Sequence, residues 1–112
     1  MGIQSNSDMA ENCKQILLQL GFCAHHSGYK QLKIGILQFL LDDQQCLDSE
    51  LYPYIVRELN CTDEDAVERS IGRSIAFAWN HSDRERWEKY FPGCKKVPSN
   101  KRFIATIAEF IS

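Results

Sequence analysis

The chain has 112 residues, of which 44% are hydrophobic and 25% charged, and its formal net charge is -2 at pH 7. This length accommodates one domain with one core, and the composition is ordinary for a soluble globular protein. No apolar run approaches the roughly 20 residues that a membrane-spanning helix needs. The N-terminus also lacks the basic start and apolar stretch of a secretory signal. We therefore expect a cytoplasmic protein with no membrane partner.

The cysteine pattern does not indicate disulfides or a metal centre. The five cysteines are an odd number and form no CxxC pair, which favours free thiols in a reducing compartment. The segment CAHH at 23–26 comes nearest to a metal-binding motif. A zinc site needs about four ligands at paired spacings, and neither His81 nor Cys94 supplies a second pair. Two loop histidines are the better interpretation, and we predict no metal and no cofactor.

The hydrophobic pattern is helical along the whole chain. No segment alternates strictly between apolar and polar residues, and no two-residue hairpin signal appears. The prediction is therefore an all-α fold, a six-helix bundle that forms a single domain over 9–112. Residues 1–8 are expected to be a flexible lead-in.

The first two helices are predicted from their boundary signals. The first should run over 9–20, with Ser7 or Asp8 as its N-cap and Gly21 as its stop. The second should begin near Gly28 and end near 42–43. Its inward side chains are Leu32, Ile36, Leu37, Phe39 and Leu40.

The third and fourth helices are predicted to form a helix-turn-helix. The third begins near Ser49, because Pro53 is tolerated only close to a helix start. A polar turn at 60–62 follows, and the fourth helix covers about 63–79. Apolar residues recur at helical spacing in both helices: Leu51, Ile55 and Leu59, then Val67, Ile71, Ile75, and Ala78 or Trp79. A short amphipathic helix, a tight turn and a longer amphipathic helix are typical of this motif.

Two further helices complete the bundle. The fifth should run over 84–91, with Trp87, Tyr90 and Phe91 on one side, and the Pro-Gly pair at 92–93 ends it. The sixth should run over 100–111 with Ser99 as its cap. Its inward residues are Phe103, Ile104, Ile107, Ala108 and Ile111.

Charge is distributed unevenly along the chain. Residues 1–73 carry 6 Lys and Arg against 11 Asp and Glu, whereas residues 74–112 carry 7 against 4. A local basic patch can attract phosphates even when a domain is acidic overall. Ordinary solvated helix faces are the competing interpretation.

Enzymatic chemistry is not indicated. The sequence contains no phosphate-binding loop, no dinucleotide fingerprint, no GxSxG nucleophile motif and no HExxH zinc motif. We predict no catalytic residues and no enzyme.

Ordered motifs over most of the chain resemble one family. They are Leu20-Gly21 with Ala24-His25; Gly28-Tyr29 with Leu32; Leu51-Tyr52-Pro53-x-Ile55; Asn60-x-Thr62; Val67-Glu68-Arg69-x-Ile71; Ile75-x-x-Ala78-Trp79; and Pro98-x-Asn100-x-x-Phe103-Ile104-Ala105. Together they resemble the C-terminal DNA-binding domain of the stage-zero sporulation protein A family, the response regulator that initiates sporulation. The resemblance extends from about Cys13 to Ile111.

This resemblance implies a fold and a set of partners. It implies a six-helix bundle whose fourth helix enters the major groove of double-stranded DNA, commonly on tandem half-sites. It also implies contacts with a second copy of the domain, as a homodimer, and with the RNA polymerase sigma subunit. The receiver domain that controls the family by phosphorylation does not lie within these 112 residues.

The resemblance also assigns DNA-contacting positions. Glu68 and Arg69 fall on family positions that meet DNA, and Arg73 lies one turn further on the same exposed face. The candidate interface is Asp65, Ala66, Glu68, Arg69, Gly72 and Arg73, with Lys30, Lys33, Lys95 and Lys96 as phosphate contacts.

Several departures from the family pattern support an alternative function. Ala66 replaces an arginine that reads guanine, Gly72 replaces a basic residue, and acids occupy 63–65. The alternative is a protein-interaction module that kept the fold and lost DNA recognition, with contact surfaces around Trp87, Lys101 and Arg102. A positive rim of lysines around the start of the fourth helix favours DNA, whereas an unbroken negative face favours the module.

Overall fold

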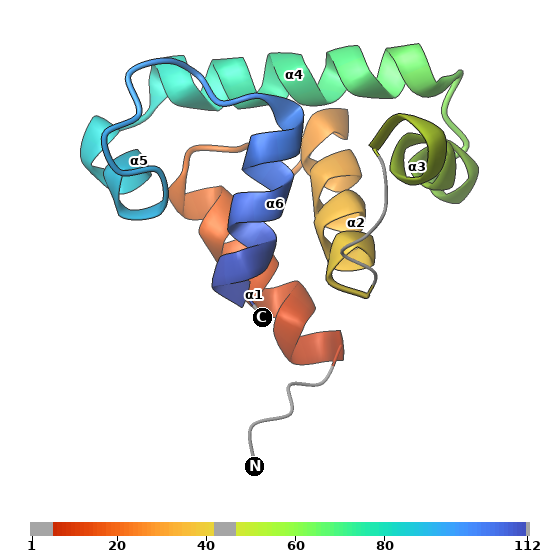
Figure 1. The fold of residues 1–112 in the computed structure, drawn as a ribbon, viewed down its shortest axis with the longest axis horizontal. Helices are drawn as coiled ribbons and strands as arrows, with labels where there is room; N and C mark the ends of the chain where they lie inside the picture. Colours follow the sequence, from red (N-terminus) through yellow and green to blue (C-terminus); the bar gives the residue numbers. More distant parts are fainter. Residues whose placement is uncertain (1–5, 42–46, 112) are drawn as a thin grey trace.

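The computed structural model describes residues 6–41 and 47–111 (Figure 1). Within these ranges the chain forms helices and no strand, which confirms the all-α prediction. The elements are α1 (Asn6–Gln19), α2 (Ser27–Leu41), the π-helical turn η1 (Leu47–Leu51), α3 (Tyr52–Leu59), α4 (Glu64–His81), α5 (Arg84–Tyr90) and α6 (Asn100–Ile111).

The first helix begins earlier than predicted. α1 starts at Asn6, so Ser7 and Asp8 lie in its first turn and the predicted N-cap is wrong. The positive end of the helix dipole stabilises an acidic side chain in the first turn, which explains why Asp8 fits inside the helix. Gly21 ends the helix as predicted. Its φ is +98°, and the Phe22 N–H donates to the Leu17 carbonyl at 3.1 Å.

The third helix begins later than predicted. A helix starting at Ser49 would need the nitrogen of Pro53 to donate to the Ser49 carbonyl, and proline has no N–H. The chain instead makes the η1 turn over 47–51, and α3 begins at Tyr52 with Pro53 as its second residue. The predicted end of the second helix, at 42–43, lies outside the described residues.

One hydrophobic cluster forms the core and draws on all six helices. The predicted inward faces of α4 and α6 are fully confirmed, because every residue that was predicted to lie on them is buried. This includes both Ala78 and Trp79. Along α2 and α3 the predicted faces are less deeply covered. Leu37, Phe39, Leu40 and Leu59 are half-buried and pack against the cluster.

Trp87 lies at the centre of an aromatic group in this core. Its ring centroid is 5.1 Å from that of Trp79, 5.6 Å from Phe91 and 5.7 Å from Phe103. Its indole N–H donates to the Leu20 carbonyl at 3.1 Å, and the side chain is only 1% exposed. The prediction that Trp87 forms part of a contact surface is therefore wrong. Trp87 belongs to the apolar face of α5, and this face packs into the core.

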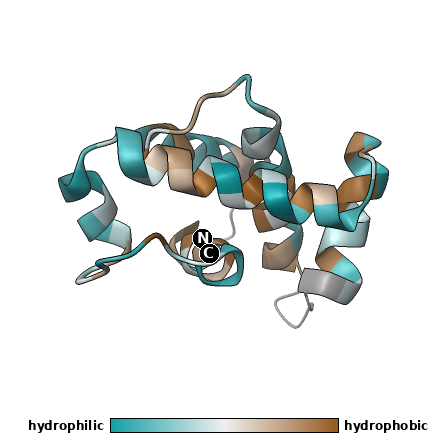
Figure 2. Ribbon diagram, turned by 90° about the horizontal axis from the view of Figure 1, so that it is seen from above, coloured by the Kyte–Doolittle hydropathy of each residue, from teal (hydrophilic) through white to brown (hydrophobic). Residues whose placement is uncertain are grey.

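α4 lies across one side of the molecule and rests on the ends of α2 and α6 (Figure 1). Gly28 marks its closest approach to α2, since a Cβ there would lie 1.7 Å from the Oγ of Ser74. The Oγ atoms of Ser27 and Ser70 also meet, at 3.4 Å. Seen from above, hydrophilic and hydrophobic residues alternate along α4, and no other described helix lies over it (Figure 2). Among the described residues, no helix has the length and apolar character to cross a membrane.

Candidate DNA interface

A tight turn joins α3 to α4. Asn60 adopts a left-handed conformation with φ of 54°, which asparagine tolerates better than most residues, and Cys61 donates its N–H to the Val56 carbonyl at 3.0 Å. Asp63 then caps α4, because its Oδ1 accepts the N–H of Ala66 at 2.8 Å. Of the two residues predicted as this cap, Thr62 and Asp63, the structure uses Asp63. The helix-turn-helix outline predicted from the sequence matches this arrangement.

The turn is attached to α2 by a buried amide. Gln31 is 6% exposed, and its Nε2 lies 3.6 Å from the Sγ of Cys61. Its Oε1 has no hydrogen-bond partner among the described residues. A thiol is a weak partner for an amide, so this contact orients the turn without adding much stability.

Arg69 and Arg73 occupy successive turns on the outer side of α4. The buried face of the helix runs through Val67, Ile71 and Ile75, and at 100° per residue both arginines lie almost opposite it. Both are exposed. Within the described part of the chain, neither guanidinium is held by a hydrogen bond or an ion pair. Two unengaged cations with this spacing can meet the groove or the backbone of a duplex.

The other predicted contacts on α4 do not all share this face. Ala66 is half-buried and lies one turn before Arg69. Asp65 is exposed in the first turn. Glu68 and Gly72 lie on the flank toward α6: Asn100 donates its Nδ2 to the Glu68 carbonyl at 3.1 Å, and a Cβ at Gly72 would be 3.5 Å from the Oδ1 of Asn100. Glu68 keeps an exposed side chain, whereas Gly72 forms part of a helix contact.

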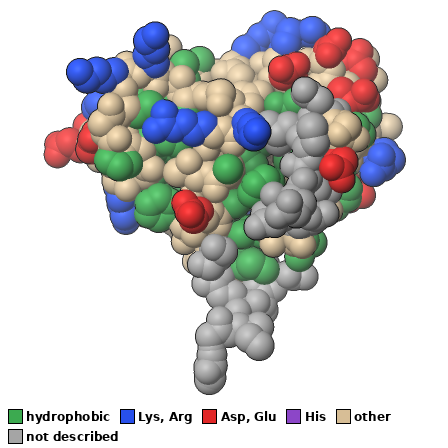
Figure 3. Space-filling model, viewed as in Figure 1, with side chains coloured by type: hydrophobic (Ala, Val, Ile, Leu, Met, Phe, Trp, Pro, Cys, Tyr) green, Lys and Arg blue, Asp and Glu red, His purple; other side chains and the backbone are tan. Residues whose placement is uncertain are grey.

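Charge changes sign along α4. Figure 3 shows acidic side chains gathered at the end where α4 begins, and Lys and Arg side chains over its middle and toward α5. Asp63, Glu64 and Asp65 are exposed at that acidic end. This is neither the continuous positive rim nor the unbroken negative face that the two hypotheses predicted.

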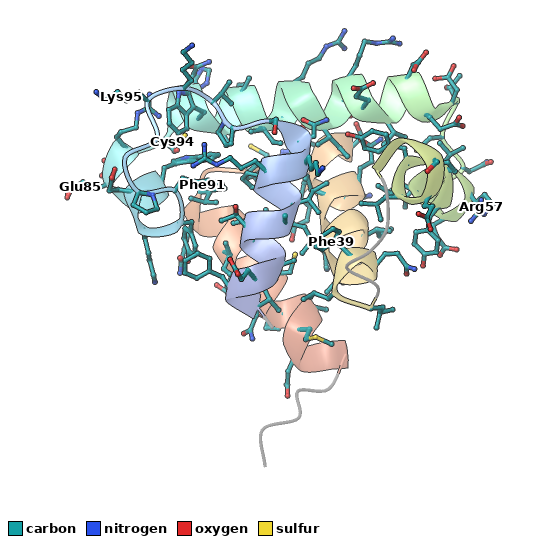
Figure 4. The ribbon with its side chains drawn as sticks, viewed as in Figure 1. Phe39, Arg57, Glu85, Phe91, Cys94 and Lys95 are labelled. Carbon is teal, nitrogen blue, oxygen red and sulfur yellow. The ribbon has the colours of Figure 1, made fainter. Side chains whose placement is uncertain are left out.

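The four lysines predicted as phosphate contacts lie in two separate places. Lys30 is exposed and Lys33 half-buried on α2, whereas Lys95 and Lys96 are exposed in the loop between α5 and α6. Figure 4 places Lys95 near the α5 side of the molecule, away from α3 and Arg57. The Lys95–Lys96 pair therefore lies toward the C-terminal end of α4, and not at its start.

Thiols and histidines form no metal centre in the described residues. The cysteines there, Cys13, Cys23, Cys61 and Cys94, are free, as predicted, and Cys46 lies outside those residues. No group of three or more His, Cys, Asp or Glu side chains in ranges 6–41 and 47–111 is arranged to hold a metal ion. Burial raises the pKa of the Cys13 thiol from 9.0 to about 12, against a smaller opposing effect of Lys33.

Two features of the interface were missed in the sequence. Asn100 links α6 to α4 and to α3, since its Nδ2 also donates to the Tyr52 hydroxyl at 3.0 Å. Phe77 and His81 continue the row of Arg69 and Arg73 at the same spacing of four. The i, i+4 spacing that relates Arg73 to Arg69 in the sequence also predicts both of these residues.

Comparison with known families agrees with this architecture. A family model described as "Sporulation initiation factor Spo0A C terminal" matches residues 13–111, which is nearly the whole chain. That family consists of DNA-binding regulatory domains and is not an enzyme family. The chain therefore belongs to the Spo0A C-terminal family, the DNA-binding effector domain of a sporulation transcription regulator.

Proposed function

We propose that this domain binds double-stranded DNA by placing α4 in the major groove, with Arg69 and Arg73 as its principal contacts. The observation that carries the proposal is the pair of exposed guanidiniums on successive turns, both without a protein partner among the described residues. An arginine at a base edge pairs with guanine, and an arginine at the groove wall binds phosphate. This function places the domain in the cytoplasm, on the chromosome.

Base recognition differs from that of the wider family in this proposal. The short side chain of Ala66 cannot make the bidentate guanine contact that the resemblance assigns to an arginine at this position. The loss of one such contact costs roughly 1–3 kcal/mol of discrimination. Glu68 remains able to accept a hydrogen bond from a cytosine amino group. We therefore place sequence readout in the second and third turns of α4, beyond the acidic first turn.

Phosphate contacts flank this helix. Lys95 and Lys96 border a hollow of about 550 Å³ that residues 93–99 and Arg102 line. Lys30 and Lys33 on α2 are the second pair of candidates. Because phosphate contacts position a protein without reading sequence, these lysines are expected to set affinity and salt dependence, and not the preferred site.

Selection from a randomised duplex library at low salt tests the proposal. The wild-type domain is expected to enrich a short motif, and Arg69→Ala to bind that motif more weakly. Lys14→Gln on α1, away from α4, is the matched control for the loss of one positive charge. The proposal fails if the folded wild-type domain retains no duplex.

The resemblance adds two protein partners to the proposal. A second copy of the domain would bind beside the first on tandem half-sites, and the RNA polymerase sigma subunit would contact the bound domain. Cooperative binding to a duplex with two copies of the selected motif, compared with one copy, tests the homodimer.

A second candidate function is favoured by the acidic start of α4. Asp63, Glu64 and Asp65 present three exposed carboxylates beside Ala66, which suits a basic protein surface better than a phosphate backbone. Under this alternative the domain is a protein-interaction module. Sequence-specific retention of DNA with no salt-sensitive binding to a basic protein partner would count against it.

A further inference from the structure

All three histidines of the chain lie in one chain of ring contacts at the C-terminal end of α4, in which Phe77 meets His26 and His81, and His25 meets His26. Phe77 stacks on His81, with ring centroids 4.0 Å apart and planes 17° apart. His26, from the loop between α1 and α2, meets Phe77 edge-on at 5.8 Å, and His25 meets His26 at 5.6 Å. We call these four residues the histidine cluster.

The histidine cluster belongs to the surface and not to the core. Phe77 is 42% exposed, and His25, His26 and His81 are all exposed. The Nδ1 of His81 lies 2.9 Å from the Phe77 carbonyl. Because a carbonyl only accepts, Nδ1 donates this bond, and Nε2 has no partner in the described part of the protein. Protonation at Nε2 therefore leaves the geometry of the ring unchanged.

The cluster continues the row of arginines along α4. Arg69, Arg73, Phe77 and His81 follow one another at intervals of four residues, so each neighbours the next on the helix surface. From Arg69 to His81 the helix rises about 18 Å, at about 1.5 Å per residue. The major groove is only about 12 Å wide. When Arg69 contacts base edges, the end of this row lies over the flanking sugar-phosphate backbone.

The charges around the cluster suit an anion. Arg73 lies one turn before Phe77 on α4. Lys30, on α2, follows the loop residue His26 by four positions. The guanidinium of Arg84 is bonded to the Trp79 carbonyl at 2.8 Å. The nearest carboxylate in sequence, that of Asp83, caps α5 by accepting the Glu85 N–H at 3.1 Å. Within one helical turn of the cluster in sequence, cations therefore outnumber carboxylates.

We infer that the histidine cluster is a binding site for a DNA backbone phosphate, one that binds more tightly once its imidazoles carry protons. The inference rests on the proposed function, because it places the cluster at the end of the DNA-contacting row. Imidazole is the side chain that changes charge between pH 5 and 8. A protonated imidazole forms a charge-assisted hydrogen bond with a phosphate oxygen and thereby adds to the counterion release that drives binding. DNA binding thus becomes stronger as pH falls through this range.

Fluorescence anisotropy with a labelled duplex of mixed sequence tests this inference. Affinity is measured at about pH 7.5 and about pH 6 over a series of salt concentrations. The wild-type domain is expected to bind several-fold tighter at the lower pH, because protonated imidazoles add charge-assisted hydrogen bonds to phosphate. The slope of log affinity against log salt should also steepen by about one unit per added contact.

Three variants separate the cluster from the rest of the interface. The triple variant His25→Gln, His26→Gln and His81→Gln should lose the tightening at low pH. Arg69→Ala should weaken binding at both pH values and keep that tightening. Lys14→Gln should behave as the wild type, and circular dichroism checks that each variant is folded.

The outcomes distinguish the two proposals. Wild-type binding that does not change with pH overturns the histidine site and leaves the DNA-binding function intact. Tightening that persists in the triple variant also overturns it. Absence of duplex binding at both pH values overturns the histidine site and the proposed function together.

Discussion

Ala66 stands one turn before Arg69, at the position where the resemblance implies a guanine-reading arginine. Its methyl group is half-buried and too short for the contact that an arginine would make. The first turn of α4 therefore carries acids and no cation. The departures that the resemblance implies are thus at the residue scale, in a few side chains of α4.

Restoring the arginine should strengthen DNA binding. The Ala66→Arg variant is expected to gain about 1–3 kcal/mol of affinity for a duplex with guanine at the contacted position, measured by fluorescence anisotropy. Asn12→Arg on α1, which is exposed and distant from α4, controls for an added charge. An equal gain in that control would show that charge alone, without base contact, explains the effect.

Cys13 should make stability depend on pH in the alkaline range. Burial raises the pKa of its thiol from 9.0 to about 12, so the folded state favours the protonated form. This stabilisation is complete below pH 9 and is lost as pH rises toward 12. The free energy of unfolding should fall by up to about 1.4 kcal/mol per pH unit across this window on account of Cys13.

Urea unfolding at pH values between 8 and 11 measures this loss. Burial also raises the pKa of Tyr29, so some decline should remain above about pH 10 in a Cys13→Ala variant. A variant whose stability declines as steeply as that of the wild type would contradict the assignment to Cys13.

At the element scale, the acids at the start of α4 have different roles. Asp63 accepts the Ala66 N–H as the N-cap, whereas Asp65 lies exposed in the first turn, one turn before Arg69. Asp63→Ala should lower the free energy of unfolding by about 1 kcal/mol. Asp65→Asn should change stability by less than that and tighten duplex binding by removing repulsion from phosphates. Thermal unfolding and anisotropy on both variants measure the two effects, and equal destabilisation by both would refute the separation.

Two glycines should respond oppositely to alanine. At Gly28 a Cβ would overlap Ser74, so Gly28→Ala should destabilise the α2–α4 contact by about 1–3 kcal/mol. At Gly72 a Cβ would meet, of the described residues, only Asn100, at 3.5 Å, so Gly72→Ala should be neutral or stabilise α4 by up to about 1 kcal/mol. Denaturant midpoints compare the pair. A tolerated Gly28→Ala would mean that α4 can move away from α2.

Helical periodicity was enough to predict which segments form helices. It was less successful in predicting where the helices begin and end and which of their faces are covered. Spacing placed the core residues of α4 and α6 correctly, because burial follows the helical period. It did not predict the start of α3, where the missing N–H of Pro53 requires a different turn. Nor could it show that Trp87 points into the core, since an amphipathic stripe does not say which neighbour covers it.

At the scale of the whole molecule, α4 is held across the ends of α2 and α6 with its outer side uncovered (Figure 1). The net charge of -2 conceals a division between an acidic start and a basic middle of this helix. Local charge, and not the total, governs association with phosphates at distances within the Debye length. The sequence contained both halves of this division, but only the fold shows that Lys95 lies toward the far end of α4.

The central claim is that the middle of α4 carries DNA binding through Arg69 and Arg73. Anisotropy titrations of a selected duplex over a range of salt, with the wild type and an Arg69→Ala, Arg73→Ala double variant, test it most directly. We predict salt-sensitive binding by the wild type and, in the double variant, a loss of about 100-fold in affinity with a slope shallower by about two units. An unchanged affinity and slope in the folded double variant would contradict the account.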